Sequence, residues 1–330
     1  MNKEKDNAYG LVYDGALEKN EEGKVNIHQV NYSLHGLKIA ANVYTPAGYE
    51  ETKKYPAIVV AHPNGGVKEQ VAGLFAQRLA ELGYITMAFD AAYQGQSEGM
   101  PRNTDRPQNR VEDIHGALDY IVRCPDVDRT RVGALGICGG GGYTLRAAQT
   151  DKRIKAVATL SAFNTGIVRK NGFLDTQINT IPERLEEAYK ARELELSGTE
   201  VRYTPNMLDT LTPAQAEELP FDLYREGYEY YGDLCKHTGS SFSYTVSSNI
   251  DLFAFDARIG MEMINQPLLM MAGKLADTLY MTEGCYEKAT GTKNKELFLI
   301  DKAHHIQTYY VPEYVDQEVN KLKEFFGANL

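Results

Sequence analysis

One cysteine of this sequence lies in a pattern that suits covalent chemistry. Cys138 stands in Gly136-Ile137-Cys138-Gly139-Gly140, between an apolar run and a run of small residues. In a sharp turn from strand to helix, a nucleophile projects from the sheet edge, and the glycines two positions away let strand and helix approach. The helix N-terminus would favour a thiolate over a thiol. The pattern predicts a nucleophile; the alternative for Cys138 is a small buried apolar side chain.

A cysteine nucleophile needs a base, and the base needs a group that orients it. In a fold with such a turn, the expected chain order is nucleophile, acid, histidine. Asp277 and the pair His304-His305 each follow a late apolar run, so we expect both at the sheet edge that carries Cys138. Only one of two adjacent histidines can face the site. The sequence thus predicts a triad of Cys138, Asp277 and one histidine, with Asp301 the weaker candidate for the acid.

The same chemistry needs backbone amides that stabilise a developing oxyanion. One is expected from Gly139, which directly follows the nucleophile. The other is expected from the loop His62-Pro63-Asn64-Gly65-Gly66, which follows the first buried apolar run. Pro63 has no amide hydrogen, so Asn64 or Gly65 is the predicted donor, with Asn64 preferred. A metal site is not predicted, because adjacent histidines rarely ligate one ion and no third ligand stands out.

The elements that must position these residues can be read from the apolar pattern. Two strand-like runs around His35-Gly36 predict an antiparallel hairpin. Continuous apolar runs predict parallel strands buried on both faces, and amphipathic stripes between them predict helices. The predicted strands are 27–34, 37–44, 57–61, 84–89, 132–135, 154–160, 267–272 and 296–300. Their alternation with helices predicts an α/β fold with a doubly wound, mostly parallel sheet and an antiparallel hairpin at its edge.

One long segment interrupts that alternation. Between two predicted strands lie about 90 residues, too many for a plain loop, and they contain helix-like pieces such as 181–196 and 212–232. We therefore expect a mostly helical cap at 164–255, inserted into a core formed by 1–163 and 256–330. The cap is rich in tyrosine, and Tyr224 and Tyr228 are candidates for an acyl pocket. The alternative is that these rings fill the interior of the cap.

Composition excludes several classes of function. The 330 residues carry 45 acidic side chains against 35 Lys and Arg, for a net charge of −10. This balance disfavours nucleic acid and anionic membrane surfaces as partners. The start of the chain lacks the apolar stretch of a secretory signal, and four scattered cysteines form no disulfide framework. We expect a cytoplasmic protein that acts on a small molecule. The sequence leaves open whether the protein forms a homo-oligomer.

Taken together and in this order, the motifs resemble an α/β-hydrolase of the dienelactone-hydrolase-like branch, and most closely its YcjY-like subgroup. The resemblance rests on AHPNGGVKEQ (61–70), FDAAYQGQSEGMPR (89–102), VDRTRVGALGICGGGGYTLRAA (127–148), AGKLADT (272–278) and AHHIQTYY (303–310). It implies a triad of Cys138, Asp277 and His305. His305 is preferred over His304, because an apolar residue, Ile306, follows it directly and an aromatic residue, Tyr309, stands three positions after that.

The function that the resemblance implies is hydrolysis of an ester, a thioester or a lactone, with no cofactor. Two alternatives remain. Acyl transfer would use the same groups with an acceptor other than water, and some fungal members of the subgroup are associated with it. The second alternative is a non-catalytic ligand-binding protein of the same fold. It stays open because Lys274 and Lys302 replace smaller residues beside the predicted acid and histidine, which would alter the local geometry of the triad.

Overall fold

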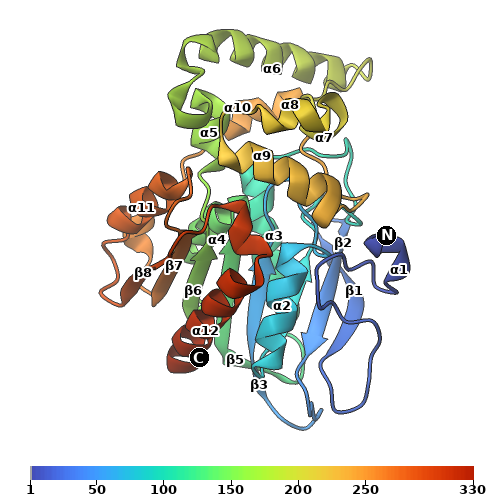
Figure 1. Ribbon diagram of the computed structural model, residues 1–330, viewed down its shortest axis with the longest axis vertical. Coiled ribbons are helices and arrows are strands. Elements are labelled where there is room, and N and C mark those ends of the chain that lie inside the picture. Colours follow the sequence, from blue (N-terminus) through green and yellow to red (C-terminus); the bar gives the residue numbers. More distant parts are fainter. Residues whose placement is uncertain (1) are drawn as a thin grey trace.

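The computed structural model describes residues 2–330, and an eight-stranded sheet forms its centre (Figure 1). The strand order is β1-β2-β4-β3-β5-β6-β7-β8. All eight predicted strands are present, with ends that differ by a few residues. Their bounds are β1 Asn26–Leu34, β2 Leu37–Thr45, β3 Tyr55–Ala61, β4 Ile85–Phe89, β5 Val127–Ile137, β6 Ala156–Leu160, β7 Leu268–Gly273 and β8 Lys295–Ile300.

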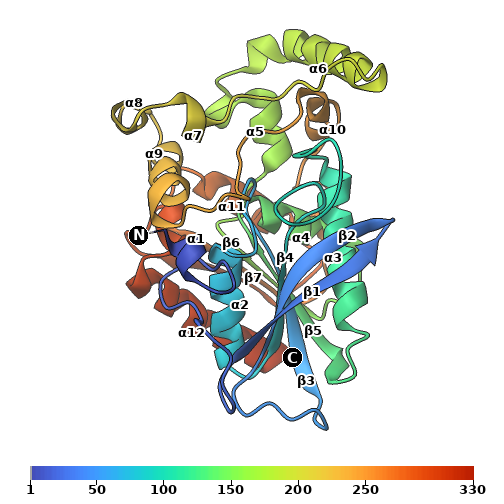
Figure 2. The same ribbon diagram turned by 90° about the vertical axis from the view of Figure 1, so that its right-hand side faces the viewer.

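The sheet is mixed in the way the sequence predicts. β1 and β2 form an antiparallel hairpin, with Asn26 opposite Thr45, and β2 pairs antiparallel with β4. From β4 to β8 every pairing is parallel. The hairpin turn at His35-Gly36 has positive φ at both residues, 48° and 82°, which is the geometry that matches the twist of the two strands. Figure 2 shows this hairpin along one edge of the sheet.

Helices cover both faces of the sheet, so the central strands are buried on both sides. Along β3, Ile58 and Val60 contribute to one hydrophobic cluster, whereas Val59 and Ala61 contribute to the other. This period-2 alternation within one apolar run is the signature of a strand between two helical layers. The helices of the core are α2 Val71–Glu81, α3 Pro107–Ile121, α4 Gly139–Thr150, α11 Leu279–Lys288 and α12 Pro312–Asn329, and the short α1, Lys3–Asp6, lies near the N-terminus.

The chain between β6 and β7 lies beyond the carboxyl ends of the parallel strands, at the top of Figure 1. It is mostly helical. Its helices are α5 Thr165–Asn171, α6 Ile181–Leu196, α7 Met207–Thr210, α8 Pro213–Glu217, α9 Asp222–Glu229 and α10 Asn249–Leu252, and a π-helical turn, Tyr230–Leu234, follows α9. We refer to these residues, 164–255, as the cap. In the part of the chain that is described, no helix combines the length and the apolar character needed to cross a bilayer.

The second helical piece predicted in the cap is two helices. Thr212 starts α8 with a capping box, in which its hydroxyl accepts from the Gln215 amide and the Gln215 side chain accepts from the Thr212 amide. α8 ends before Pro220, because a proline removes one backbone donor and clashes with the preceding turn. α9 then begins at Asp222 in a new direction. This break lets α9 descend toward the sheet edge that carries Cys138.

Candidate active site

Cys138 occupies a strained turn between β5 and α4. Its φ of 53° and ψ of −121° lie outside the regions that most residues adopt. A Cβ atom on Gly136 would lie 2.5 Å from the Gly140 carbonyl oxygen and from Thr144 Oγ1, and one on Gly140 would lie 2.5 Å from the Ala61 carbonyl oxygen. The glycines are therefore required by close approach of strand and helix, as the sequence pattern predicts.

Backbone hydrogen bonds hold this turn in place. The Cys138 amide donates to the Leu160 carbonyl at 2.9 Å, and its carbonyl accepts from Gly141 at 2.8 Å and from Phe163 at 2.9 Å. The last of these bonds ties the elbow to the segment that leads into the cap. Cys138 is buried but lines a cavity beneath the cap. Its side chain is thus presented to this cavity from a backbone that is held by hydrogen bonds.

Two backbone amides point to the Cys138 side chain. They belong to Gly139, at the start of α4, and to Asn64, in the loop after β3. The Asn64 side chain donates to Thr165 Oγ1 at 2.9 Å, which fixes this loop against the first helix of the cap. Both predicted donors, Gly139 and Asn64, therefore lie next to the Cys138 side chain.

His305 lies in the core directly behind this site. It has no solvent-exposed surface, and both ring nitrogens have hydrogen-bond partners: Nδ1 is 2.6 Å from Thr278 Oγ1, and Nε2 is 2.8 Å from the Tyr309 hydroxyl. Burial lowers the pKa of His305 to about 3. The imidazole is therefore neutral at physiological pH.

Tyr309 and Cys138 also line the same cavity, and the Tyr309 hydroxyl acts on the Cys138 side chain by lowering the pKa of its thiol. One phenol thus lies between the predicted nucleophile and the predicted base. The side chains form a row in the order Cys138, Tyr309, His305, Thr278. We call this row the hydroxyl chain, because hydroxyl groups flank the imidazole on both sides.

Asp277 is not brought to His305, in contrast to the predicted triad. Its Oδ2 accepts a hydrogen bond from the Leu223 amide at 3.1 Å, in the first turn of α9. The positive end of a helix dipole is a favourable place for a carboxylate. Thr278, the next residue, is buried and faces the imidazole instead. Thr278 has helical backbone angles and caps α11, and of the two adjacent residues only Thr278 reaches His305.

His304 also points away from Cys138. Its Nδ1 is 2.7 Å from Glu226 Oε1 of the cap, and Asp222 Oδ2 lies 3.8 Å away. These three side chains lie within 4.8 Å of one another, and their hydrogen bond joins the cap to the loop after β8. Of the two adjacent histidines, His305 is therefore the one that faces the site.

The expected thiolate is not the resting form of Cys138. Burial raises the pKa of the thiol above its usual value, although the Tyr309 hydroxyl and the two amides act in the opposite direction. Desolvation of the charged form outweighs the donors and the helix N-terminus here. The side chain is a neutral thiol at rest, and a base must remove its proton during the reaction.

The cavity in front of Cys138 has a volume of about 260 Å³. Its walls are mostly apolar and aromatic, and Arg169 is its one charged lining residue. The Arg169 guanidinium lies over the Tyr244 ring, 4.4 Å from the centroid. Besides these, the lining comprises Pro63, Asn64, Phe163, Val168, Thr204, Pro205, Met207, Leu223, Tyr224, Gly227, Tyr231, Phe242, Ile306 and Tyr309.

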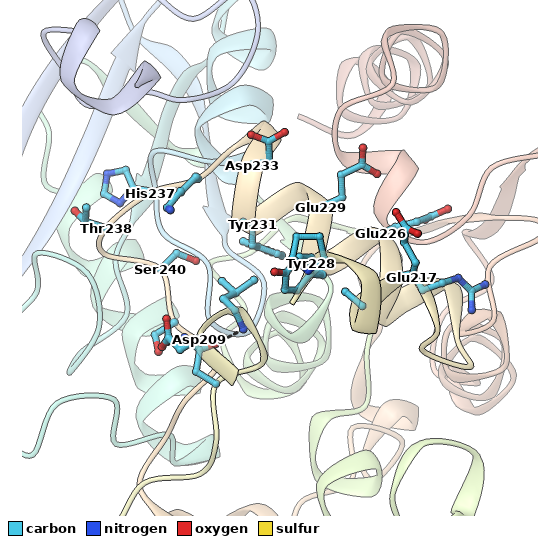
Figure 3. Close-up of a pocket in the computed structure, with 18 residues that line it drawn as sticks. Asp209, Glu217, Glu226, Tyr228, Glu229, Tyr231, Asp233, His237, Thr238 and Ser240 are labelled. Atoms are coloured by element: carbon cyan, nitrogen blue, oxygen red, sulfur yellow. Dashed lines mark hydrogen bonds between the residues drawn. The ribbon is translucent and has the colours of Figure 1, made fainter. Parts of the chain in front are cut away.

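Of the two tyrosines that are candidates for an acyl pocket, Tyr224 lines the Cys138 cavity and Tyr228 does not. Tyr228 faces a separate outer groove of about 900 Å³, shown in Figure 3, and its hydroxyl donates to the Leu211 carbonyl at 3.1 Å. Both tyrosines lie on α9, about one helical turn apart. Tyr231 lines both spaces and separates them.

Comparison with known proteins decides the family. The model of the dienelactone hydrolase family matches residues 39–165. The Escherichia coli protein YcjY is 36% identical over 298 residues, which are 89% of this chain and 95% of YcjY. The chain belongs to the dienelactone hydrolase family of the α/β-hydrolases.

Two further relatives extend this family assignment. The crystal structure of PA2218 from Pseudomonas aeruginosa superimposes with a TM-score of 0.84 at 29% identity, covering 94% of this chain and 95% of that one. The acyltransferase drtE of Aspergillus calidoustus is 24% identical over 92% of this chain and 95% of its own length. The match to PA2218 includes the cap, so this α/β-hydrolase shares its whole architecture with a solved member of the subgroup.

The part matched by the family model contains Asn64 and Cys138 but ends before Asp277 and His305. Sequence reasoning missed two members of the hydroxyl chain in the unmatched part. Tyr309 had a signal only as the aromatic residue that the family resemblance places shortly after the histidine, and it ends the 3₁₀ turn Ile306–Tyr309 that follows His305. No sequence signal pointed to Thr278, because the carboxylate of the neighbouring Asp277 was the expected partner for a histidine.

Proposed function

We propose that this α/β-hydrolase cleaves an ester, a thioester or a lactone of a small molecule through an acyl intermediate on Cys138. The observation that carries the proposal is the position of the Cys138 side chain. It faces a cavity beneath the cap, and the amides of Gly139 and Asn64 point to it. A nucleophile beside preorganised amide donors is what acyl transfer requires.

The chemistry follows from these groups. As Sγ attacks the acyl carbonyl carbon, the thiol proton leaves toward His305, and the carbonyl oxygen takes negative charge beside the two amides. Collapse of this intermediate breaks the bond to the leaving group, which takes up a proton. A thioester between the substrate acyl group and Cys138 remains, and attack by water releases the acid and restores the thiol.

The cavity favours a small, largely apolar acyl group. Its volume of about 260 Å³ lies near the lower end of the range for small-molecule sites, and its walls are mostly hydrocarbon and aromatic rings. No carboxylate lies beside His305, so the imidazolium that forms during attack has little support. Substrates with good leaving groups, such as thioesters and activated esters or lactones, therefore suit the site better than amides.

Acyl transfer is the second candidate, and one observation favours it. drtE, a relative along nearly the whole chain, is an acyltransferase. The largely apolar walls of the cavity also suit an organic alcohol or amine acceptor better than water. Adding such an acceptor to the assay separates the two: transfer forms an acylated acceptor in preference to the free acid.

The test uses a panel of short-chain p-nitrophenyl esters and N-acetylcysteamine thioesters with wild type, Cys138→Ala and Cys124→Ala. Cys124 is half-buried and distant from the cavity, so its substitution is the matched control. We expect the Cys138 variant to lose at least ~1,000-fold in kcat/KM, and the Cys124 variant to keep wild-type values. Mass spectrometry of quenched wild type should show an acyl group on the peptide that contains Cys138. Full turnover by Cys138→Ala, or an acyl group elsewhere, overturns the proposal.

A further inference from the structure

Tyr309 occupies a place that the expected chemistry does not assign to any side chain. Its hydroxyl lies 2.8 Å from His305 Nε2 and also reaches the Cys138 side chain. A base in the usual arrangement contacts the nucleophile directly. Here the nitrogen that would take the thiol proton is already occupied by a phenol. A proton that leaves Cys138 for His305 must pass this hydroxyl or displace it.

The position of the phenol is fixed by packing. Tyr309 is almost fully buried, and its ring contacts Tyr230 at 5.5 Å and His305 at 5.5 Å between centroids, both nearly edge to face. It belongs to the 3₁₀ turn that starts directly after His305, and the Thr308 hydroxyl donates to the His305 carbonyl at 2.6 Å. A side chain held by both neighbours and backbone has little freedom to swing out of the row.

The protonation states around Tyr309 set a direction for the hydrogen bonds. Burial raises the pKa of Tyr309 well above its usual value, so the phenol keeps its proton, and His305 is neutral. A neutral imidazole has one nitrogen that accepts and one that donates. When the Tyr309 hydroxyl donates to Nε2, Nδ1 carries the proton and donates to Thr278 Oγ1. The phenol oxygen is then free to accept a proton from the Cys138 thiol.

Resting on the proposed function, we propose that Tyr309 is a catalytic residue that carries the proton between Cys138 and His305. During attack the S–H bond breaks as the S–C bond forms. The thiol proton moves to the phenol oxygen of Tyr309, and the original phenol proton moves to His305 Nε2. The carbonyl π electrons become the oxyanion, and Nδ1–H of the imidazolium stays hydrogen-bonded to Thr278.

The same path runs backwards when the intermediate collapses. The bond from the acyl carbon to the leaving group breaks, and the leaving group takes a proton from the Tyr309 hydroxyl. His305 Nε2 returns its proton to the phenol oxygen, so the imidazole is neutral again. When water or another acceptor attacks the acyl-enzyme, its proton passes through the phenol to His305; the C–S bond then breaks, and Sγ takes a proton from the phenol, which His305 replaces. Charge is thus never left on the phenol.

The matched pair of variants is Tyr309→Phe and Tyr230→Phe. Each removes one hydroxyl from a fully buried tyrosine, and the two rings pack against each other. Tyr230 does not line the Cys138 cavity, whereas Tyr309 does. The rate of acylation is measured in a single turnover with a p-nitrophenyl ester. Proton transfer by a positioned group contributes about 10²- to 10⁴-fold, so we expect at least a ~100-fold loss for Tyr309→Phe and less than a ~3-fold change for Tyr230→Phe.

A second measurement separates proton transfer from mere support of the fold. The Tyr309 hydroxyl lowers the pKa of the Cys138 thiol, so alkylation by iodoacetamide should shift to higher pH in Tyr309→Phe and stay unchanged in Tyr230→Phe. Introducing 3-fluorotyrosine at position 309, which keeps the ring and makes the phenol more acidic, should change the acylation rate without changing the melting temperature.

These outcomes are distinguishable from failure of the proposed function. If wild type forms no acyl group on Cys138, the function itself is wrong. If wild type forms one and Tyr309→Phe forms it within ~3-fold of the same rate, the function stands and the relay is overturned. An unshifted alkylation profile in Tyr309→Phe also contradicts a contact between phenol and thiol.

Discussion

The two halves of the site are built in different ways. On the nucleophile side, the elbow at Cys138 and the Asn64 loop are fixed by backbone geometry, because glycines permit contacts of strand, helix and loop that any Cβ would prevent. On the base side, His305 is positioned by side chains from the loops after β7 and β8, Thr278 and Tyr309. Backbone constraints leave a short sequence signature, whereas side-chain partners across loops do not.

The largest effect is expected where the backbone leaves no space. A Cβ on Gly140 would lie 2.5 Å from the Ala61 carbonyl oxygen and 2.6 Å from that of His62. Gly140→Ala should therefore cost about 2–4 kcal/mol in the free energy of unfolding and remove most acyl-transfer activity, since the loop that carries Asn64 must shift. Urea denaturation and the ester assay measure both.

The control for that variant is Gly327→Ala, because no atom lies within 4 Å of a Cβ at Gly327. Gly327 lies in α12, where alanine is the better helix former, so this variant should keep or slightly raise stability. Wild-type stability and activity in Gly140→Ala would show that the elbow is less constrained than its contacts indicate.

The pH profile distinguishes the observed base from one paired with a carboxylate. The pKa of His305 is lowered to about 3, so the imidazole stays neutral and able to accept a proton at any pH well above that value. At pH 5 only about 1% of such a group is protonated. We expect kcat/KM to show no fall between roughly pH 7.5 and pH 5 that follows protonation of a histidine. A fall of tenfold or more with a midpoint near pH 6.5 would mean that His305 titrates normally.

The smallest effect is expected in substrate preference. Tyr224 lines the Cys138 cavity, and Tyr228, one helical turn away, lines the outer groove. Tyr224→Ala should enlarge the acyl site and shift the preferred ester by two or more carbons, with a change of a few-fold in relative kcat/KM. Tyr228→Ala is the control and should leave the ranking of esters as it is. The reverse result would place the acyl group in the groove of Figure 3.

The sequence predicted the scaffold well for a physical reason. Strands buried on both faces need continuous apolar runs, and these runs located the six strands β3 to β8, whereas the turn dipeptide His35-Gly36 located the hairpin β1-β2. The elbow was predicted because its glycines are required by close contacts, those of Gly136 within the elbow and α4 and those of Gly140 with the end of β3. The cap helices were less accurate, since Pro220 splits a piece that has one continuous amphipathic pattern.

The partners of His305 could not be predicted in the same way. Asp277 and Thr278 are adjacent, and the choice between them depends on which one faces inward when the turn after β7 begins α11. That direction is set by α9, whose first turn binds the Asp277 carboxylate from 54 residues away in the sequence. A local pattern carries no information on such a contact.

The central claim of this account is that Thr278, and not Asp277, positions the base. The most direct measurement is kcat for the pair Thr278→Val and Asp277→Asn, with melting temperatures as the check on folding. Valine lacks the hydroxyl that forms the hydrogen bond with His305 Nδ1. We therefore expect kcat to fall about tenfold, which corresponds to the loss of one buried hydrogen bond. Asparagine still accepts from the Leu223 amide, so kcat should stay within about twofold. A large loss in Asp277→Asn together with full activity in Thr278→Val would contradict the account.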